Sequence, residues 1–191
     1  VYYENKIVTI HDVAFERFPQ TFSWKFRLLY KNLIPRLLRS CLSVVTVSEF
    51  SRSEISEVYG YDKDKILVVY NAVSDGFIQN VSKPRDEYIL AVASLNYHKN
   101  LHTLIKAFNR LDRNDVKLYI IGGFNKNFAN TSLVQDIEKN KNIVFKGRVD
   151  DDELIRLYSN ALCFVFPSLY EGFGIPPLEA QACGCPVLIS N

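Results

Sequence analysis

The chain has 191 residues, of which 48% are hydrophobic and 23% charged, and its formal net charge is +2. These values are ordinary for a globular protein that can bury a core. No apolar run reaches the length of about 18 residues that a membrane-spanning helix needs, so the sequence predicts no such segment.

The four cysteines, Cys41, Cys163, Cys183 and Cys185, do not suggest a disulfide framework in a chain of this size. Cys183 and Cys185 are separated only by Gly184 and lack the second ligand pair that a zinc site needs. We interpret the cysteines as buried thiols in a reducing cytosol and expect a cytoplasmic protein without a bound metal. Because the sequence contains no methionine, even at position 1, we also expect it to be a fragment.

The first predicted strand, residues 6–10, ends at His11 and Asp12. Open α/β sheets bind ligands at the carboxyl ends of their strands, so this polar pair is a candidate for a binding site. A histidine at a strand end can also be purely structural. We expect Asp12 to orient or cap neighbouring groups rather than to act as a base.

Residues 22–40 form a predicted basic amphipathic helix, which Pro35 is expected to kink or divide. Its cations are Lys25, Arg27, Lys31, Arg36 and Arg39, and no acidic residue accompanies them. Such a helix is typical of binding to an anionic membrane surface, but it can equally be an ordinary domain helix whose cations face water. Because no other basic stripe is present, we do not expect nucleic-acid binding.

The rest of the chain alternates between strands and helices. The predicted strands are 42–47, 66–69, 87–93, 117–121, 142–146, 161–166 and 187–189, and the main predicted helices begin at Ser48, Leu101, Asp150 and Pro176. This pattern predicts an α/β fold with three strands in a first domain (1–78), a linker (79–86) and five strands in a second domain (87–191). An NAD(P)-dependent oxidoreductase is an alternative, but the G-x-G-x-x-G fingerprint is absent at Gly122-Gly123.

The most informative stretch, 167–186, reads P-S-L-Y-E-G-F-G-I-P-P-L-E-A-Q-A-C-G-C-P between two buried strands. The prolines at 176 and 177 predict a helix start and Gly184 its end, so Glu171 lies in a loop and Glu179 in the first helical turn. The glycines on either side of Phe173 allow positive φ and close approach of a ligand.

This loop combines two kinds of ligand-binding group. Since prolines donate no hydrogen bond, a phosphate would meet the amides of Gly172–Ile175, whereas the carboxylates can accept hydrogen bonds from sugar hydroxyls. The loop therefore suits a sugar joined to phosphate. Glu179 can alternatively be a helix-start glutamate favoured by the macrodipole, and the glycines can be plain turn residues.

The stretch 167–187 resembles the E-x7-E signature of retaining GT-B glycosyltransferases of family 4, and it matches each fixed position of P-S-x-x-E-G-F-G-x-P-x-L-E-A-x-A-x-G-x-P-V. That family includes bacterial mannosyl- and glucosyltransferases. The resemblance implies a GT-B fold of two Rossmann-like domains, of which the amino-terminal one is incomplete here and the donor-binding one nearly complete. It also implies metal-independent transfer of a hexose from a nucleotide-diphosphate sugar to a polysaccharide or lipid-linked saccharide.

The resemblance assigns roles to individual residues. It implies that Lys99 and the amides of Gly172, Phe173, Gly174 and Ile175 hold the diphosphate, and that Arg148 and Val149 lie near the nucleotide base. In the same way, it implies that Glu179 bonds the ribose, while Glu171 and His11 contact the transferred sugar. Lys99 alone would be interpreted as a solvated charge.

Two departures from the family pattern concern this assignment. Ala72 stands where the family usually has glycine, and Ala93-Ser94 stand where some relatives place an arginine. We expect the 191 residues to bind nucleotide diphosphate without transferring sugar, and a non-catalytic nucleotide-sugar-binding remnant remains an alternative. The protein is expected in the cytoplasm, with peripheral attachment at the inner membrane face if residues 22–40 bind lipid.

Overall fold

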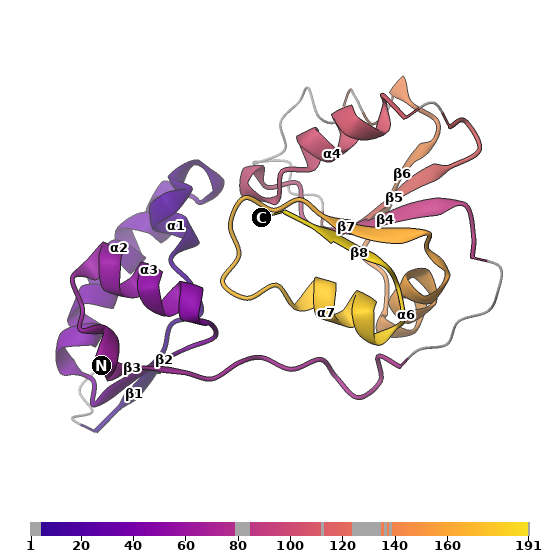
Figure 1. Cartoon of the computed structure of the whole chain (residues 1–191). Coiled ribbons are helices and arrows are strands. Elements are labelled where there is room, and N and C mark those ends of the chain that lie inside the picture. The colour runs from indigo at the N-terminus through magenta and orange to yellow at the C-terminus, as the bar shows by residue number, and fades with distance from the viewer. Residues whose placement is uncertain are drawn as a thin grey trace. The chain divides into compact units, whose positions relative to one another are not determined.

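The computed structural model describes residues 5–78, 85–111, 113–123, 135, 137 and 139–190, and Figure 1 shows the chain as helices and strands. The chain divides into two compact units, which are treated separately below. Unit 1 comprises Val1–Ala72 and Tyr170–Gly174, and unit 2 comprises Val73–Leu169 and Ile175–Asn191. Of the predicted linker, residues 79–84 lie outside the described part. No helix in the described ranges has both the length and the apolar character needed to cross a bilayer.

Unit 1 is built on a parallel sheet with the strand order β1-β2-β3. Its strands are β1 (Ile7–Thr9), β2 (Ser43–Thr46) and β3 (Ile66–Val68). Its helices are α1 (Ala14–Arg17), α2 (Trp24–Ser40) and α3 (Glu49–Tyr59), with the short 3-10 helices η1 (Pro19–Thr21) and η2 (Lys63–Lys65). The register places Val8, Val44 and Ile66 side by side on the face that meets the core.

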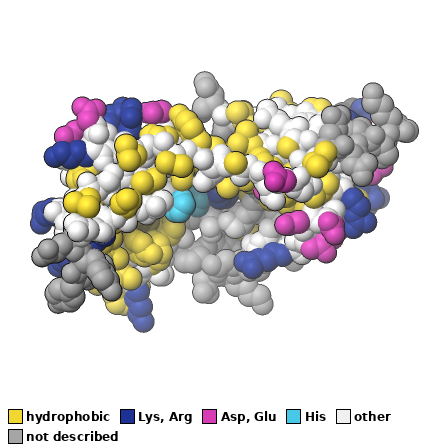
Figure 2. Space-filling model, turned by 90° about the horizontal axis from the view of Figure 1, so that it is seen from below, with side chains coloured by type: hydrophobic (Ala, Val, Ile, Leu, Met, Phe, Trp, Pro, Cys, Tyr) yellow, Lys and Arg dark blue, Asp and Glu magenta, His cyan; other side chains and the backbone are white. Residues whose placement is uncertain are grey.

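One apolar core joins this sheet face to the helices. Its buried residues include Val13, Phe15, Ile34, Leu38, Val44, Ile55 and Ile66. On the opposite face of the sheet, Ile7 is 69% and Leu67 56% exposed. In the view of Figure 2, hydrophobic side chains are exposed on unit 1.

Helix α2 is continuous through Pro35, so the expectation that this proline divides the helix is wrong. The helix begins after Ser23, whose hydroxyl accepts a hydrogen bond from the Phe26 amide. Proline removes the hydrogen bond to the carbonyl of Lys31. Lys31 is exposed, so water can satisfy that carbonyl, while Ile34 and Leu38 fix the helix on the core.

Unit 2 contains a five-stranded parallel sheet with the order β6-β5-β4-β7-β8. Its strands are β4 (Tyr88–Val92), β5 (Lys117–Ile121), β6 (Ile143–Gly147), β7 (Cys163–Phe166) and β8 (Val187–Ile189). Its helices are the 3-10 helix η3 (Tyr97–Lys99) and the α-helices α4 (Leu101–Phe108), α6 (Asp151–Asn160) and α7 (Ile175–Ala182). These bounds confirm the predicted alternation of five strands with helices.

The sheet of unit 2 is covered on both faces. Helix α4 packs on one face through Leu101, Leu104 and Ile105, and α6 and α7 pack on the other (Figure 1). Cys183 and Cys185 are buried in the second of these cores and, like Cys41 and Cys163, are free thiols. Burial raises the pKa of Cys185 to about 11, so this thiol is protonated and inert at neutral pH.

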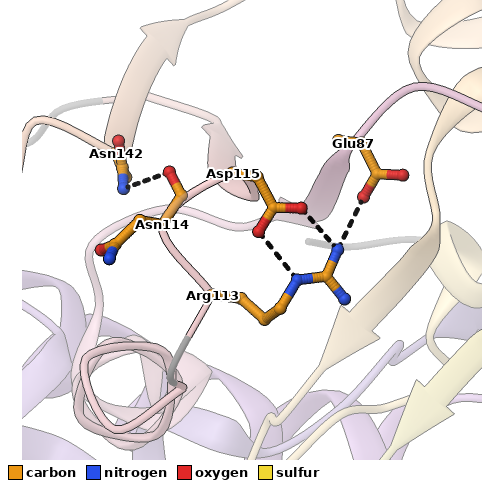
Figure 3. A network of polar contacts seen from close by, with 5 residues as sticks. All are labelled: Glu87, Arg113, Asn114, Asp115 and Asn142. Carbon is orange, nitrogen blue, oxygen red and sulfur yellow. Dashed lines mark hydrogen bonds and ion pairs between the residues drawn. The ribbon is translucent and has the colours of Figure 1, made fainter.

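A polar network ties the segment before β5 to the amino ends of neighbouring strands (Figure 3). The Arg113 guanidinium donates from Nε to Asp115 at 2.8 Å and from Nη2 to Glu87 at 3.2 Å. The Asn142 side chain, just before β6, donates to the Asn114 carbonyl at 3.3 Å. The hydrogen bonds from Arg113 lower the pKa of Asp115. The network lies at the edge of the sheet opposite to the predicted binding edge.

Candidate functional site

At the carboxyl edge of the unit 2 sheet, three strand ends meet through backbone alone. The Ala93 amide donates to the Ile121 carbonyl, and the Gly122 amide donates to the Gly147 carbonyl, both at 2.8 Å. Gly122 has φ +155°, and a Cβ there would lie 2.2 Å from the Ala93 carbonyl oxygen. Only glycine fits this position, so the strand ends present main-chain groups without intervening side chains.

Arg148 folds over the end of β5. A Cβ placed on Gly123 would lie 3.3 Å from the Arg148 Nε atom, so the guanidinium rests against this glycine. The turn before it uses Gly147 with φ +75°. Val149 packs its side chain against the core, which leaves its main chain for any contact with a ligand.

Lys99 is the last residue of η3 and is held at the end of β7. The next residue, Asn100, takes a left-handed conformation with φ +55°, and its side-chain amide donates to the Pro167 carbonyl at 3.0 Å. A second bond, from the Leu169 amide to the His98 carbonyl at 2.8 Å, joins the same two segments. The motif Asn-Tyr-His-Lys-Asn therefore attaches Lys99 to the strand that leads into the glycine loop.

Glu179 lies in the second turn of α7, so its predicted place in the first turn is wrong. The helix begins at Ile175 rather than at the prolines, and its first turn contains no acidic residue. The interpretation of Glu179 as a helix-start glutamate therefore loses its basis. The Tyr158 hydroxyl donates to Glu179 Oε2 at 3.1 Å. Burial raises the pKa of the Glu179 carboxyl, and the Tyr158 hydrogen bond partly opposes this effect.

In unit 1, His11 and Asp12 follow β1 as predicted. His11 is exposed, and Asp12 Oδ1 accepts a hydrogen bond from the Ala14 amide at 2.9 Å. This hydrogen bond forms a turn at the start of α1 in which the Asp12 side chain is fixed.

The loop Tyr170–Gly174, which connects β7 to α7, is anchored in unit 1 by two aromatic side chains. Tyr170 is buried, with its ring 5.8 Å from that of Phe18 and 5.2 Å from that of Phe50. The ring of Phe173 lies 6.2 Å from that of Tyr70. Glu171 is half-buried between the anchored Tyr170 and the buried Gly172.

Gly172 is a glycine because of close approach rather than positive φ. A Cβ there would lie 2.8 Å from the His11 carbonyl oxygen and 2.9 Å from Asp12 Cβ. Only Gly174 of the two loop glycines has positive φ, at +89°. The predicted positive φ is therefore correct for Gly174 and wrong for Gly172. The structure brings Gly172 directly against the predicted pair His11 and Asp12.

Sequence reasoning missed the partners of the Gly172 carbonyl. A helix was predicted to begin at Ser48, and the Ser48 hydroxyl is the N-cap of α3, accepting from the Ser51 amide at 3.0 Å. The same hydroxyl also donates to the Gly172 carbonyl, as does the hydroxyl of Ser51 at 3.0 Å. The available signal was the string Val47-Ser48-Glu49-Phe50-Ser51, written V-S-x-x-S below, but an N-cap at Ser48 is enough to account for it.

The predicted site residues fall into two sets, one in each unit. Unit 2 contributes Lys99, Arg148, Val149, Ile175 and Glu179, and unit 1 contributes His11, Glu171, Gly172, Phe173 and Gly174. Within the described ranges, no three His, Cys, Asp or Glu side chains are grouped so that they could hold a metal ion.

The chain thus contains a parallel α/β unit with glycine turns at the carboxyl edge of its sheet. A second parallel unit precedes it in the sequence. Residues 74–191 match the family model for glycosyl transferases group 1, and residues 5–77 match that for Glycosyltransferase Family 4. The first match covers more than half of the chain. The chain therefore belongs to the glycosyl transferases group 1 family, which contradicts the oxidoreductase alternative.

Two curated relatives are O-antigen mannosyltransferases. The chain is 36% identical over 190 residues to the O-antigen chain mannosyltransferase RfbU of Salmonella typhimurium, which covers 98% of this chain and 52% of that protein. It is 32% identical over 205 residues to the O-antigen chain mannosyltransferase B of Escherichia coli, with 98% and 53% covered. The chain thus spans about half the length of these relatives.

Solved structures confirm the GT-B-type fold. Anabaena Alr3699/HepE, in complex with UDP and glucose, superimposes with a TM-score of 0.75 at 20% identity, covering 95% of this chain and 51% of that one. WaaG, a glycosyltransferase involved in lipopolysaccharide biosynthesis, gives a TM-score of 0.73 at 18% identity, with 96% and 55% covered.

Proposed function

We propose that the protein transfers a hexose, with mannose the first candidate, from a nucleotide-diphosphate sugar to a saccharide acceptor. The observation that carries this proposal is the loop Tyr170–Gly174. It belongs to a stretch that matches every fixed position of the family signature, and ring contacts and hydrogen bonds hold it in place. The mannosyltransferase relatives support mannose, and the neighbour bound to UDP and glucose supports a nucleotide-sugar donor. The O-antigen relatives also support a polysaccharide or lipid-linked acceptor.

The unit 2 residues would bind the nucleotide. Lys99 would supply a cation that compensates the diphosphate, and the amides of Gly172–Ile175 would donate to its oxygens, so that the leaving group is stabilised without a metal ion. Arg148 would lie near the base. The main chain at Val149 would meet the base, and the Glu179 carboxylate, with lone pairs beyond the one used by Tyr158, would accept from the ribose hydroxyls.

Glu171 and His11 would act on the sugar. Glu171 would accept hydrogen bonds from hydroxyls of the transferred hexose, and His11 would contact the same sugar. We propose that transfer proceeds with retention of configuration, because the loop matches the signature of retaining enzymes. The roles of His11 and Glu171 rest on that resemblance.

The test is a calorimetric titration with UDP, GDP and ADP, followed by the mannose- and glucose-bearing forms of the nucleotide that binds. We expect one nucleotide to bind preferentially. Failure of all three nucleotides to bind would refute the proposal.

Because the chain spans about half of its relatives, we propose that these 191 residues bind the donor but transfer sugar only when joined to the remaining length. Binding without transfer in the longer protein would instead support the non-catalytic alternative.

A second proposed property is attachment of α2 to an anionic membrane surface at the inner face. The supporting observation is that Trp24, Leu28 and Leu29 are 67%, 57% and 59% exposed on a helix that also carries five cations and no acid. Together with Asn32, Leu33 and Arg36, these residues line a shallow hollow of about 500 Å³. Exposed apolar side chains among cations are what a helix lying in a lipid headgroup region requires.

A further inference from the structure

The Gly172 carbonyl receives two hydroxyl hydrogen bonds from the beginning of α3. The hydroxyls of Ser48 and Ser51 both donate to this oxygen, and the Ser48 hydroxyl accepts from the Ser51 amide in turn. A carbonyl oxygen has two lone pairs, so both are used. Ser51 is fully buried, so without Gly172 its hydroxyl would lose this partner in a place that water does not reach.

The fixed carbonyl sets the direction of the neighbouring amide. A trans peptide is planar, with its C=O and N–H groups pointing in opposite directions. Because the Gly172 carbonyl points at the start of α3, the Phe173 N–H points away from it. The hydrogen bonds of the described residues include no acceptor for this amide.

The same two hydrogen bonds also polarise the peptide. A hydrogen bond to a carbonyl strengthens the N–H on the other side of the peptide as a donor, by about 10–30% per bond in condensed-phase estimates. The positive end of the α3 macrodipole, at Ser48, favours the partial negative charge on this oxygen. The Phe173 N–H is therefore both aimed and strengthened before any ligand arrives.

We propose that Ser48 and Ser51 are positioning residues of the donor site: through the Gly172 carbonyl, they aim the Phe173 N–H at a phosphate oxygen of the nucleotide diphosphate. This inference rests on the proposed function, since it names two residues that act on the same loop. It gives the V-S-x-x-S string a role beyond the cap of α3.

Two substitutions separate this role from helix stability. Ser51→Ala removes one donor to Gly172 while placing a good helix former in the first turn. Ser48→Gly removes the other donor, and glycine costs only a few tenths of a kcal/mol as an N-cap. The matched control is Ser53→Ala in the same helix, because the Ser53 hydroxyl donates to the Glu49 carbonyl and does not touch the loop. Ser48→Thr keeps both the cap and the hydroxyl.

Binding of the preferred nucleoside diphosphate to the full 191-residue chain is measured by calorimetry for each variant. We expect Ser51→Ala and Ser48→Gly each to bind about 3- to 10-fold more weakly than wild type, the loss of roughly one hydrogen bond. Ser53→Ala and Ser48→Thr should bind as wild type does. All four variants should unfold within a few degrees of wild type.

The Phe173 amide resonance in ¹⁵N-labelled protein provides a readout that a purely structural role would not change. We expect the nucleotide to move this resonance downfield in wild type and to move it less in Ser51→Ala, even at saturation. Unchanged affinity in both Ser51→Ala and Ser48→Gly, or an unresponsive Phe173 amide in a wild-type chain that binds nucleotide, would overturn the inference. If wild type binds no nucleotide, the proposed function itself fails, and this inference fails with it.

Discussion

Gly172 contacts two segments of unit 1. Its α-carbon faces His11 and Asp12, while its carbonyl faces Ser48 and Ser51. We expect Gly172→Ala to destabilise the protein by about 1–3 kcal/mol, because the added Cβ would lie 2.8 Å from the His11 carbonyl oxygen and 2.9 Å from Asp12 Cβ. The displaced loop should also weaken binding of the sugar-bearing donor. Thermal unfolding and calorimetric titration measure the two effects.

Gly76→Ala is the matched control for this substitution. Gly76 has open space around its α-carbon and no positive φ, so alanine there should leave both stability and binding unchanged. If Gly172→Ala behaved like Gly76→Ala, the close packing of the loop against His11 and Asp12 would be refuted.

The two carboxylates of the signature should differ in what they bind. We expect Glu179→Gln to weaken binding of the free nucleotide by about 1.5–3 kcal/mol, the range for a hydrogen bond to a charged group. Glu171→Gln should leave free nucleotide binding intact and weaken only the sugar-bearing donor. Titration of both variants with both ligands decides this, and an equal loss of both ligands in both variants would contradict the assignment.

Glu179 should also cost stability at neutral pH. Burial raises its pKa, so the folded state holds the proton more tightly than the unfolded state does, and the free energy of unfolding falls as pH rises through the folded pKa. Glutamine avoids the buried charge and can still accept from Tyr158. We therefore expect Glu179→Gln to be more stable than wild type at neutral pH, by less than about 1 kcal/mol because the group is half exposed to solvent.

Urea unfolding at neutral pH and near pH 4 tests this prediction. The difference between Glu179→Gln and wild type should shrink at the lower pH, where the wild-type carboxyl becomes protonated in both states. A variant that is less stable than wild type at neutral pH would show that the charged carboxylate is favoured by its surroundings.

Helix α2 has two apolar faces, and only one of them is used inside unit 1. Phe22, Phe26 and Tyr30 pack toward the core, whereas Trp24 and its apolar neighbours are exposed. Trp24 is the only tryptophan of the chain, so its fluorescence reports on α2 alone. We expect anionic vesicles to shift the Trp24 emission to shorter wavelength, because the indole would leave water for the headgroup region.

Charge provides the control for this experiment. Replacement of Lys25, Arg27 and Lys31 by Gln should abolish the shift, and raising the salt concentration should weaken it in wild type. Neutral vesicles should have little effect. An emission that does not respond to anionic vesicles, or a shift that is insensitive to salt, would return α2 to the role of an ordinary surface helix.

At the level of elements, the sequence predicted what depends on local chemistry. Apolar runs located all eight strands of the described structure, and the helix starts predicted at Ser48 and Asp150 are the N-caps of α3 and α6. The errors arose where tertiary packing decides. The core holds α2 together across Pro35, and α7 starts at Ile175, one residue before the prolines, which moves Glu179 into the second turn.

At the level of the whole chain, the fold class and the signature residues were predictable, but the attachment of the signature loop was not. The residues Tyr170–Gly174 are flanked by β7 and α7 of unit 2, yet their packing partners belong to unit 1. Nothing in the string E-G-F-G indicates that its first glycine will lie against His11, more than a hundred positions earlier in the chain. Such long-range contacts require the folded structure.

The two units differ in how their sheets are covered, and their stabilities should differ accordingly. Among the described residues, unit 2 has five strands with a core on each face. Those of unit 1 form three strands with one core, and Ile7 and Leu67 are exposed on the other face. Parallel strands are normally buried on both faces, so unit 1 lacks part of the usual stabilisation.

We expect amides of β1–β3 to exchange with solvent at lower denaturant concentration than amides of β4, β5 and β7. Hydrogen exchange followed by mass spectrometry measures this for each peptide. Nucleotide at about 100 times its Kd should then protect the unit 2 strands by up to about 2.7 kcal/mol. Identical exchange midpoints for both sets of strands, with and without nucleotide, would show that the chain unfolds as one cooperative body.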